Sequence, residues 1–292
     1  MVVIKSSLPS MAGVKRVGLK NPGRWLVGAL CIAALYFVVI AFINGQIEWN
    51  YVGQFLTSKA IISGFSNTLL MTVLAMTLGI VLGLIAALMR LSSNPVANAV
   101  GGGYIWFFRG IPIYLQLLLW FNLALIFPVV GIPGLWEART VDVMTPFWAA
   151  LLGLGVCQGA YTAEVIRAGI LSVDSGQVEA AKAVGMRESQ IMRYVVLPQT
   201  LRIITPPIGN EVIGMLKHTS IAAVISYNEV MHTASMIYFV NNRVIEMLIV
   251  CSIYYLATVT LLSILQAMLE SYLGRSLNRS NAVITKPIGA GL

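Results

Sequence analysis

Long apolar runs without a charged residue are the feature that most constrains this chain. Trp25–Asn44, Ile61–Met89 and Met247–Met268 each contain no Asp, Glu, Lys or Arg. A membrane-spanning helix needs about 20 mostly apolar residues, because lipid cannot hydrogen-bond to exposed backbone groups. Hydrophobic residues make up 58% of the 292 residues and charged residues only 10%, and a soluble domain cannot bury that much apolar surface. The sequence therefore predicts an integral membrane protein and excludes a disordered chain.

Three further segments bring the predicted number of spans to six. Ile111–Val130 is uncharged and is expected to begin upstream near Gly103, and Pro146–Ile170 carries charges only near its end. Thr205–Tyr227 is the least regular, because prolines, glycines and two charged residues interrupt it. We therefore predict an all-α integral membrane fold with about six transmembrane helices.

Lysine and arginine residues are distributed unevenly between the two sides of such a fold. With the N-terminus inside, fourteen of the 19 lie on inner segments: Lys5, Lys15, Arg16, Lys20, Arg24, Arg90, Arg167, Lys182, Arg187, Arg193, Arg202, Arg275, Arg279 and Lys286. Three lie on outer segments: Lys59, Arg139 and Arg243. Because positive residues favour the cytoplasmic side, both termini are predicted to be cytoplasmic. The first run is longer than a signal-peptide core and no A-x-A-like site follows it, so we interpret it as a retained helix.

Motifs of enzymes and of metal sites are missing from the sequence. The three cysteines, Cys31, Cys157 and Cys251, follow no metal-ligand or CxxC spacing, and His218 and His232 are far apart. There is no phosphate-binding loop, H-E-x-x-H or G-x-S-x-G motif. We therefore expect no catalytic residue, no metal, no cofactor bound by this chain and no nucleic acid partner. Energy for any work would come from a partner.

The segment Ser172–Pro198 is too long for a simple turn between two helices and is cytoplasmic by the charge argument. Asp174 with Gln177 three residues later predicts a helix N-cap and its reciprocal partner. Gly185 permits a left-handed end to that first short helix.

A second short helix is expected over Arg187–Leu197, ended by Pro198. Two short helices that meet at a glycine would form a compact knob. The small side chains of Ala180, Ala181 and Ala183 would let a partner surface approach this knob closely.

The knob carries a recognisable pattern. Glu179-Ala180-Ala181, Gly185 and Val195-Val196-Leu197-Pro198 stand at the spacing E-A-A-x3-G-x9-I-x-L-P. This resembles the EAA coupling loop of the permease subunits of bacterial ABC importers, with Val195 where the pattern favours isoleucine. Such a loop would dock as a helix in a groove of a separate ATPase subunit.

Flanking stretches are similar to the polar amino acid permease branch of that family. They are SGFSNTLL (63–70), FFRGIP (107–112), GAYTAEVIRAGILSV (159–173), GQVEAAKAVGM (176–186) and LPQTLRIITPPIGNEVIGMLKHTS (197–220). Ile111 and the run His218–Ile221 depart from the usual F-R-G-T-P and K-D/T-T-S-L. The resemblance covers roughly residues 61–270 and leaves out the first helix.

The resemblance implies a fold and a set of partners. It implies a type I ABC importer permease with a five-helix core over 61–270, including a coupling loop at 172–198 between the fourth and fifth helices. An extra helix at 25–44 and cytoplasmic tails at 1–24 and 271–292 complete the expected organisation. The expected partners are two ATPase subunits that use ATP and Mg, a second identical or similar permease subunit, and a periplasmic or lipid-anchored binding protein. The chain would lie among lipids of a bacterial inner membrane and move a polar or charged amino acid or a related compound by alternating access.

Two groups of candidate site residues follow. The expected ATPase-docking residues are Glu179, Ala180, Ala181, Gly185, Val195, Leu197 and Pro198. The hypothetical substrate pathway comprises Arg109, Glu164, Glu211, Lys217, Thr219 and Ser220. The first four are ionisable, and such groups in spans cost about 2.5–3.5 kcal/mol at the bilayer centre and should face protein or water. Ser220 shares a helix face with Lys217 in the irregular fifth span, where transporters often place substrate.

Two of the charged pathway residues, Glu164 and Arg109, also have a structural interpretation. Glu164 has a possible ion-pair partner in Arg167, three residues on. Glu211 and Lys217 are six residues apart, so they lie on different helix faces and are not expected to pair. Arg109 would either bind a substrate carboxylate or extend to the cytoplasmic interface.

Packing motifs and rival functions complete the predictions. Gly79-x3-Gly83 and Gly155-x3-Gly159 permit close helix crossing, within the chain or between two copies. An ion-coupled secondary transporter would account for the irregular fifth helix but leaves the knob without a purpose. An intramembrane enzyme using His218 or His232 has no nucleophile or metal cluster to support it.

Overall fold

A computed structural model describes the backbone of residues 22–284 and the side chains of residues 23–273. The chain divides into two compact units, residues 1–48 and 49–292. The tail predicted at 1–24 and the end of the tail predicted at 271–292 fall largely outside the described residues.

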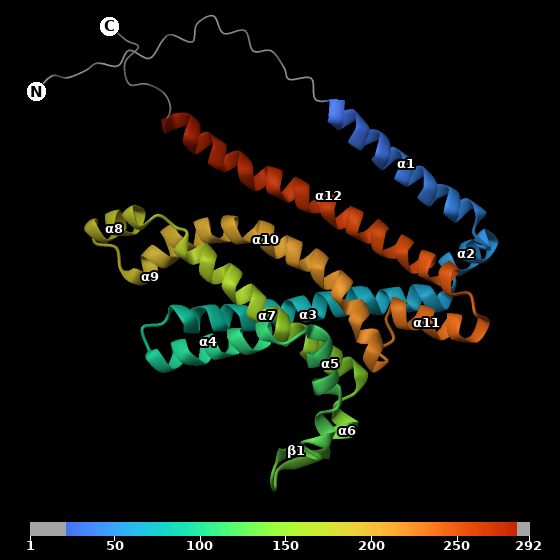
Figure 1. Ribbon diagram of the computed structural model, residues 1–292. Helices are drawn as coiled ribbons and strands as arrows, with labels where there is room; N and C mark the ends of the chain where they lie inside the picture. Colours follow the sequence, from blue (N-terminus) through green and yellow to red (C-terminus); the bar gives the residue numbers. More distant parts are fainter. Residues whose placement is uncertain (1–21, 285–292) are drawn as a thin grey trace, which may run out of the picture. The chain divides into compact units, whose positions relative to one another are not determined.

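The elements are, in order, α1 (Pro22–Asn44), α2 (Trp49–Leu56), α3 (Lys59–Leu91), α4 (Pro95–Gly110), α5 (Ile113–Phe121), η1 (Leu123–Leu125), β1 (Val129–Ile132), β2 (Trp136–Arg139), α6 (Thr140–Val143), α7 (Pro146–Leu171), α8 (Ser175–Ala183), α9 (Glu188–Ile191), η2 (Met192–Val196), α10 (Leu197–His218), η3 (Thr219–Ile225), α11 (Val230–Asn241) and α12 (Val244–Ile284). The first unit contains α1, and all later elements belong to the second unit (Figure 1). The last helix continues past residue 270, where a cytoplasmic tail was expected.

Within the described residues, the first unit contains a single helix, α1, which is apolar. None of the residues of Gly23–Asn44 is buried within the chain, and apolar side chains surround the helix on all sides. A helix of that kind is stable where its surroundings are themselves apolar.

The number of spans differs from the prediction of six. Within residues 22–284, four helices are long and apolar enough to cross a membrane, namely Gly23–Asn44, Lys59–Leu91, Pro146–Leu171 and Val244–Leu273. The bent pair α4 and α5 would make five. The helix α10 does not qualify, because its charged and polar residues lower its hydropathy.

The expected continuous span over Ile111–Val130 is wrong. The helices α4 and α5 meet at an angle of 102°, because Pro112 cannot donate the backbone bond that would continue α4. The helix α5 then ends at Phe121, and a β-hairpin follows in which Val129 pairs with Arg139. In Figure 1 this hairpin protrudes from the bundle beyond α5.

The expected helix end at Pro198 is also wrong. Residues 188–218 form one uninterrupted helix in which α9 passes through a π turn, η2, into α10. In the π turn the N–H of Leu197 donates to the carbonyl of Met192, five residues back. The longer turn lets the chain accommodate a proline that lacks an N–H, so Pro198 lies in the first turn of α10 and does not end a helix.

Glycines of α3 and α7 create the centre of the second unit. A side-chain carbon on Gly79 would lie 2.7 Å from Gln158, and one on Gly83 would lie 2.8 Å from Thr162. In the other direction, a side-chain carbon on Gly155 would lie 2.7 Å from Leu78. The predicted close crossing is confirmed and lies within the chain, where α7 crosses α3 (Figure 1).

Candidate functional site

The helices α8 and α9 form the predicted knob, which we define as residues 174–191. Asp174 caps α8 by accepting a hydrogen bond from the N–H of Gly176 at 2.6 Å. Gly185 adopts a φ of 80° between the two helices, as expected for a left-handed helix end. The knob lies at the opposite end of the second unit from α2 and α11 (Figure 1).

A small apolar core holds the knob against the end of the bundle. Its buried members are Ala181, Ile191 and Val196. This corrects the expectation for Ala181, whose side chain packs inside the knob and is 7% exposed. Gln177 also differs from the prediction. Its Oε1 accepts a hydrogen bond from Nε2 of Gln199 at 2.7 Å instead of one from the backbone N–H of Asp174.

The remaining predicted docking residues divide by exposure. Val195 is partly buried. The others are exposed: Glu179, Ala180, Gly185, Leu197 and Pro198.

Two exposed apolar side chains of this region were not predicted. Val184 is 78% exposed beside Gly185, and Tyr194 is 63% exposed in the π turn. The guanidinium of Arg193 lies 5.7 Å from the Tyr194 ring centre. The sequence signal that could have found them is a large apolar residue in a segment otherwise rich in charge. Exposed apolar groups of this kind favour contact with a partner surface.

A polar cluster joins α7 to α10 inside the bundle. Oε2 of Glu211 accepts hydrogen bonds from Oγ1 of Thr162 at 2.8 Å and from Nε2 of Gln158 at 2.9 Å. Gln158 also donates to Thr162 at 3.1 Å. We call these three residues the Glu211 cluster. Among the described residues no hydrogen bond engages Oε1 of Glu211, which leaves this oxygen available to another donor.

Glu211 was predicted from the sequence, whereas its two partners were not. Gln158 and Thr162 are four residues apart in an apolar segment, so they share one helix face. That spacing was the signal, but only the tertiary structure shows that the face meets Glu211.

Arg109 lies at the end of α4, next to the bend. Its side chain is exposed, and its guanidinium carbon lies 5.2 Å from the centre of the Tyr161 ring in α7. Such a cation–π contact holds the charge beside α7 while its hydrogen-bond donors stay available.

Glu164 forms the ion pair that its spacing suggested. Oε2 of Glu164 lies 2.8 Å from Nη2 of Arg167, with both side chains about 30% exposed. Tyr161 and Glu164 are three residues apart, so Arg109 and this ion pair lie along one side of α7.

The last predicted pathway residues lie at the end of α10. Lys217 is exposed and, within the described residues, forms no ion pair with Glu211, as predicted. The hydroxyl of Ser220 donates to the carbonyl of Lys217 at 2.7 Å, and the two residues, three positions apart, lie next to each other at the end of α10. Thr219 is fully buried and donates to the carbonyl of Leu216, so in this structure its side chain does not face water as expected, and its place in the pathway stays a prediction.

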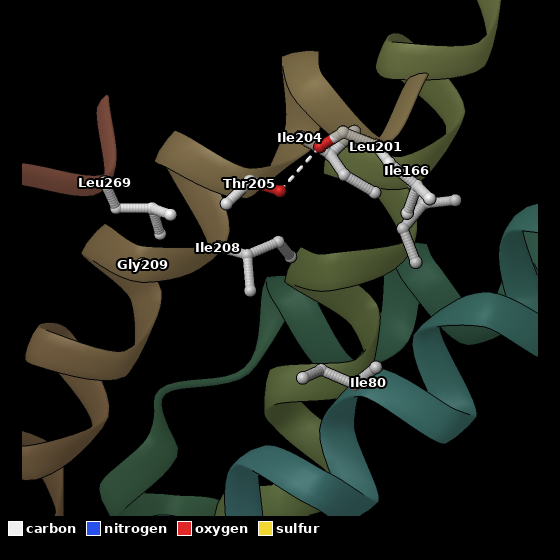
Figure 2. A pocket seen from close by; sticks show the side chains of 8 residues that line it. All are labelled: Ile80, Ile166, Leu201, Ile204, Thr205, Ile208, Gly209 and Leu269. Atoms are coloured by element: carbon white, nitrogen blue, oxygen red, sulfur yellow. Dashed lines mark hydrogen bonds between the residues drawn. The ribbon is translucent and has the colours of Figure 1, made fainter. Parts of the chain in front are cut away.

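A groove of about 320 Å³ lies where α3, α7, α10 and α12 meet. Figure 2 shows its lining, which consists of Ile80, Ile166, Leu201, Ile204, Thr205, Ile208, Gly209 and Leu269. The hydroxyl of Thr205 is turned to the carbonyl of Leu201 at 2.6 Å (Figure 2). This groove therefore presents almost entirely hydrocarbon and does not suit a polar ligand.

Metal ligands do not gather in the part of the chain that the structure describes, since no group of three His, Cys, Asp or Glu side chains could hold an ion there.

Comparisons with known proteins agree with the fold. Residues 79–275 match the family "binding-protein-dependent transport system inner membrane component". An arginine transport system permease protein of Corynebacterium glutamicum is 38% identical over 265 residues, which are 90% of this chain and 84% of that protein. The L-cystine transport system permease protein of Bacillus subtilis is 37% identical, over 73% of this chain and 86% of that protein.

Solved structures give the same result. The crystal structure of an amino acid ABC transporter with histidines has a chain that is 35% identical, with a TM-score of 0.68, over 78% of this chain and all of that chain. An inward-facing methionine ABC transporter is 18% identical with a TM-score of 0.60, over 73% of this chain and 96% of that chain, and shows the shared fold alone.

Proposed function

Because the chain belongs to the family of binding-protein-dependent transport system inner membrane components, we propose that it is an ABC importer permease subunit that carries a polar or charged amino acid or a related compound. The observation that carries this proposal is the knob: a left-handed glycine turns α8 against α9 and leaves Val184 and the surface around it exposed.

The knob is the surface on which a separate ATPase subunit docks. Its exposed part combines the small side chain of Ala180 with the apolar side chain of Val184, and the exposed Tyr194 lies in the π turn that follows the knob. Apolar anchors beside small residues suit a helix that enters a groove. ATP and Mg are bound and used by that partner, and this chain binds no cofactor.

The Glu211 cluster and Arg109 are the polar groups that meet the substrate. The free carboxylate oxygen of Glu211 suits an ammonium or guanidinium group. The guanidinium of Arg109 suits a carboxylate, which it can bind with two parallel hydrogen bonds. An amino acid carries both kinds of group, and this supports the proposed substrate class.

The assembly contains two permease subunits, identical or similar, two ATPase subunits and a substrate-binding protein on the outer side. The chain lies in the bacterial inner membrane with both termini in the cytoplasm, which the distribution of Lys and Arg supports. ATP brings the ATPase subunits together, the docked knobs follow, and the permease helices switch between outward and inward openings.

Two glycines provide a matched test of docking. Gly185 in the knob and Gly134 in the hairpin have φ angles of 80° and 79°, and neither has a neighbouring atom where a side chain would begin. A valine strains the backbone similarly at both positions. The tagged wild-type chain, Gly134→Val and Gly185→Val are extracted from native membranes in mild detergent.

The wild type and Gly134→Val are expected to bring down a nucleotide-binding subunit, and Gly185→Val is expected to lose it. ATP-dependent uptake of labelled arginine, histidine and cystine is measured with the same three chains. A wild type that purifies alone in several detergents, or a Gly185→Val chain that keeps both the subunit and uptake, would overturn the proposal.

A further inference from the structure

The bend between α4 and α5 leaves a backbone carbonyl without its usual partner. In a continuous helix the N–H of residue 112 would donate to the carbonyl of Phe108, but Pro112 has no N–H. Phe108 is partly buried, so its carbonyl needs another donor.

The side chain of Gln116 supplies that donor. Its Nε2 donates to the carbonyl of Phe108 at 2.9 Å and to the carbonyl of Ile111 at 2.8 Å. Gln116 follows Pro112 by four residues, and helical side chains lean toward the N-terminus, so the amide reaches back across the bend. The residue is 2% exposed.

The other end of the same amide has no partner. Among the described side chains, Oε1 of Gln116 is the one buried nitrogen or oxygen without a hydrogen bond. A buried acceptor without a partner costs free energy, which a leucine of similar size would avoid. The two carbonyls require the N–H groups to face them, so the orientation of the amide is determined. What the amide adds over leucine is therefore the pair of donated bonds.

The bend is also held against α7. Sγ of Cys157 lies 3.4 Å from Nε2 of Gln116 and 3.5 Å from the carbonyl of Phe108. Cys157 precedes Gln158 of the Glu211 cluster, and Arg109 within the bend lies over Tyr161 of α7. The bend, Arg109 and the Glu211 cluster therefore all meet neighbouring residues of α7.

We propose that Gln116 is a positioning residue for transport: its amide takes the place of the N–H that Pro112 lacks and holds the Arg109–Pro112 bend against α7. The effect on uptake rests on the proposed function, and the effect on the bend does not.

The test compares Gln116→Leu with Asn122→Leu. Asn122 also donates a side-chain N–H to a backbone carbonyl, that of Leu118 at 2.9 Å, but on the exposed side past the end of α5. Spin labels at Trp106→Cys in α4 and Leu119→Cys in α5, both exposed, report the bend as a distance. The background carries Cys31→Ser, because the other two cysteines are buried.

The wild type and Asn122→Leu are expected to give one narrow distance distribution. Gln116→Leu is expected to give a longer or broader one and at least about tenfold lower uptake. An unchanged distribution in Gln116→Leu would overturn the proposal, whatever its uptake. A changed distribution with normal uptake of every labelled amino acid would overturn the role in transport. If the wild type does not transport, the proposed function fails while the distances still decide the role of the amide.

A second variant covers the case in which Gln116→Leu does not accumulate. In Gln116→Leu/Pro112→Ala the N–H of residue 112 can again donate to Phe108. This double variant is expected to accumulate with a single, longer distance, since α4 can then continue straight, and to remain deficient in uptake. Two results would contradict the proposal that the amide of Gln116 takes the place of the missing N–H of residue 112. One is uptake at the wild-type level by the double variant, and the other is failure of both chains to accumulate.

Discussion

The hydroxyl of Thr162 in α7 donates a hydrogen bond to the carboxylate of Glu211 in α10, with 2.8 Å between Oγ1 and Oε2. These residues lie 49 positions apart in the sequence. An acidic group inside a membrane bundle is costly unless it is paired or functional. The bond therefore connects two central helices and at the same time keeps a charge at a defined place between them.

Glu211→Gln is expected to remove transport without unfolding the chain. The amide oxygen can still accept the bond from Thr162, whereas the charge that would meet a cationic group is lost. We expect uptake to fall at least about tenfold, the equivalent of one charge-assisted hydrogen bond. Thr162→Val should have a smaller effect, because the charge remains. Uptake of the labelled amino acids is the measurement, with Glu137→Gln on the exposed hairpin as the control. Normal uptake by Glu211→Gln would remove this residue from the pathway.

Gly83→Ala is expected to destabilise the crossing of α3 and α7 by about 1–3 kcal/mol. The new methyl group would lie 2.8 Å from Cβ of Thr162 and 3.1 Å from the backbone nitrogen of Ala163, and neither atom can move without shifting α7. Gly103→Ala is the matched control, since the helix α4 leaves open space at that position. Thermal unfolding in detergent should give a lower melting temperature for Gly83→Ala and an undiminished one for Gly103→Ala. Equal melting temperatures would contradict the close packing.

Pro198→Ala is expected to impair coupling more than stability. Restoring an N–H at residue 198 lets the π turn relax to an α-helix. Because a π turn holds one residue more than an α turn, this relaxation rotates the knob by about 100° relative to α10. The bundle should keep its melting temperature, while binding of the nucleotide-binding subunit weakens. Unchanged binding would mean that the π turn does not orient the knob.

Glu229→Ala is expected to destabilise the start of α11 by about 1–2 kcal/mol, as the loss of an N-cap does. The buried carboxylate accepts bonds from the N–H groups of Met231 at 2.9 Å and His232 at 2.6 Å, and from the hydroxyl of Tyr255 at 3.2 Å. Glu229→Gln keeps one acceptor oxygen, so it should destabilise the start of α11 less than Glu229→Ala does. Hydrogen exchange of the α11 amides measures the difference, and equal protection in both variants would contradict the capping role.

Local rules predicted the knob because its features depend on residues close in sequence. Asp174 caps a helix a few residues away, and Gly185 alone sets the left-handed turn. The position of Ala181 could not be predicted in the same way. Its burial depends on Ile191 and Val196, which α9 and the π turn bring against it in the folded structure.

The apolar runs are already enough to establish a membrane protein, because lipid restricts the backbone to helices whatever the side chains then contact. The order of Asp174 and Gly185 predicts two short helices joined by a left-handed turn, because these local features depend on few residues. That this segment is a coupling loop stays a prediction from the resemblance. Whether a proline ends a helix, bends it or begins it depends on which donor replaces the missing N–H. At Pro112 the side chain of Gln116 donates in its place. At Pro198 the helix instead changes its register through the π turn that precedes the proline. The partners of Glu211 were likewise decided by the crossing of helices far apart in sequence, because a buried charge is stable only where packing brings a donor to it.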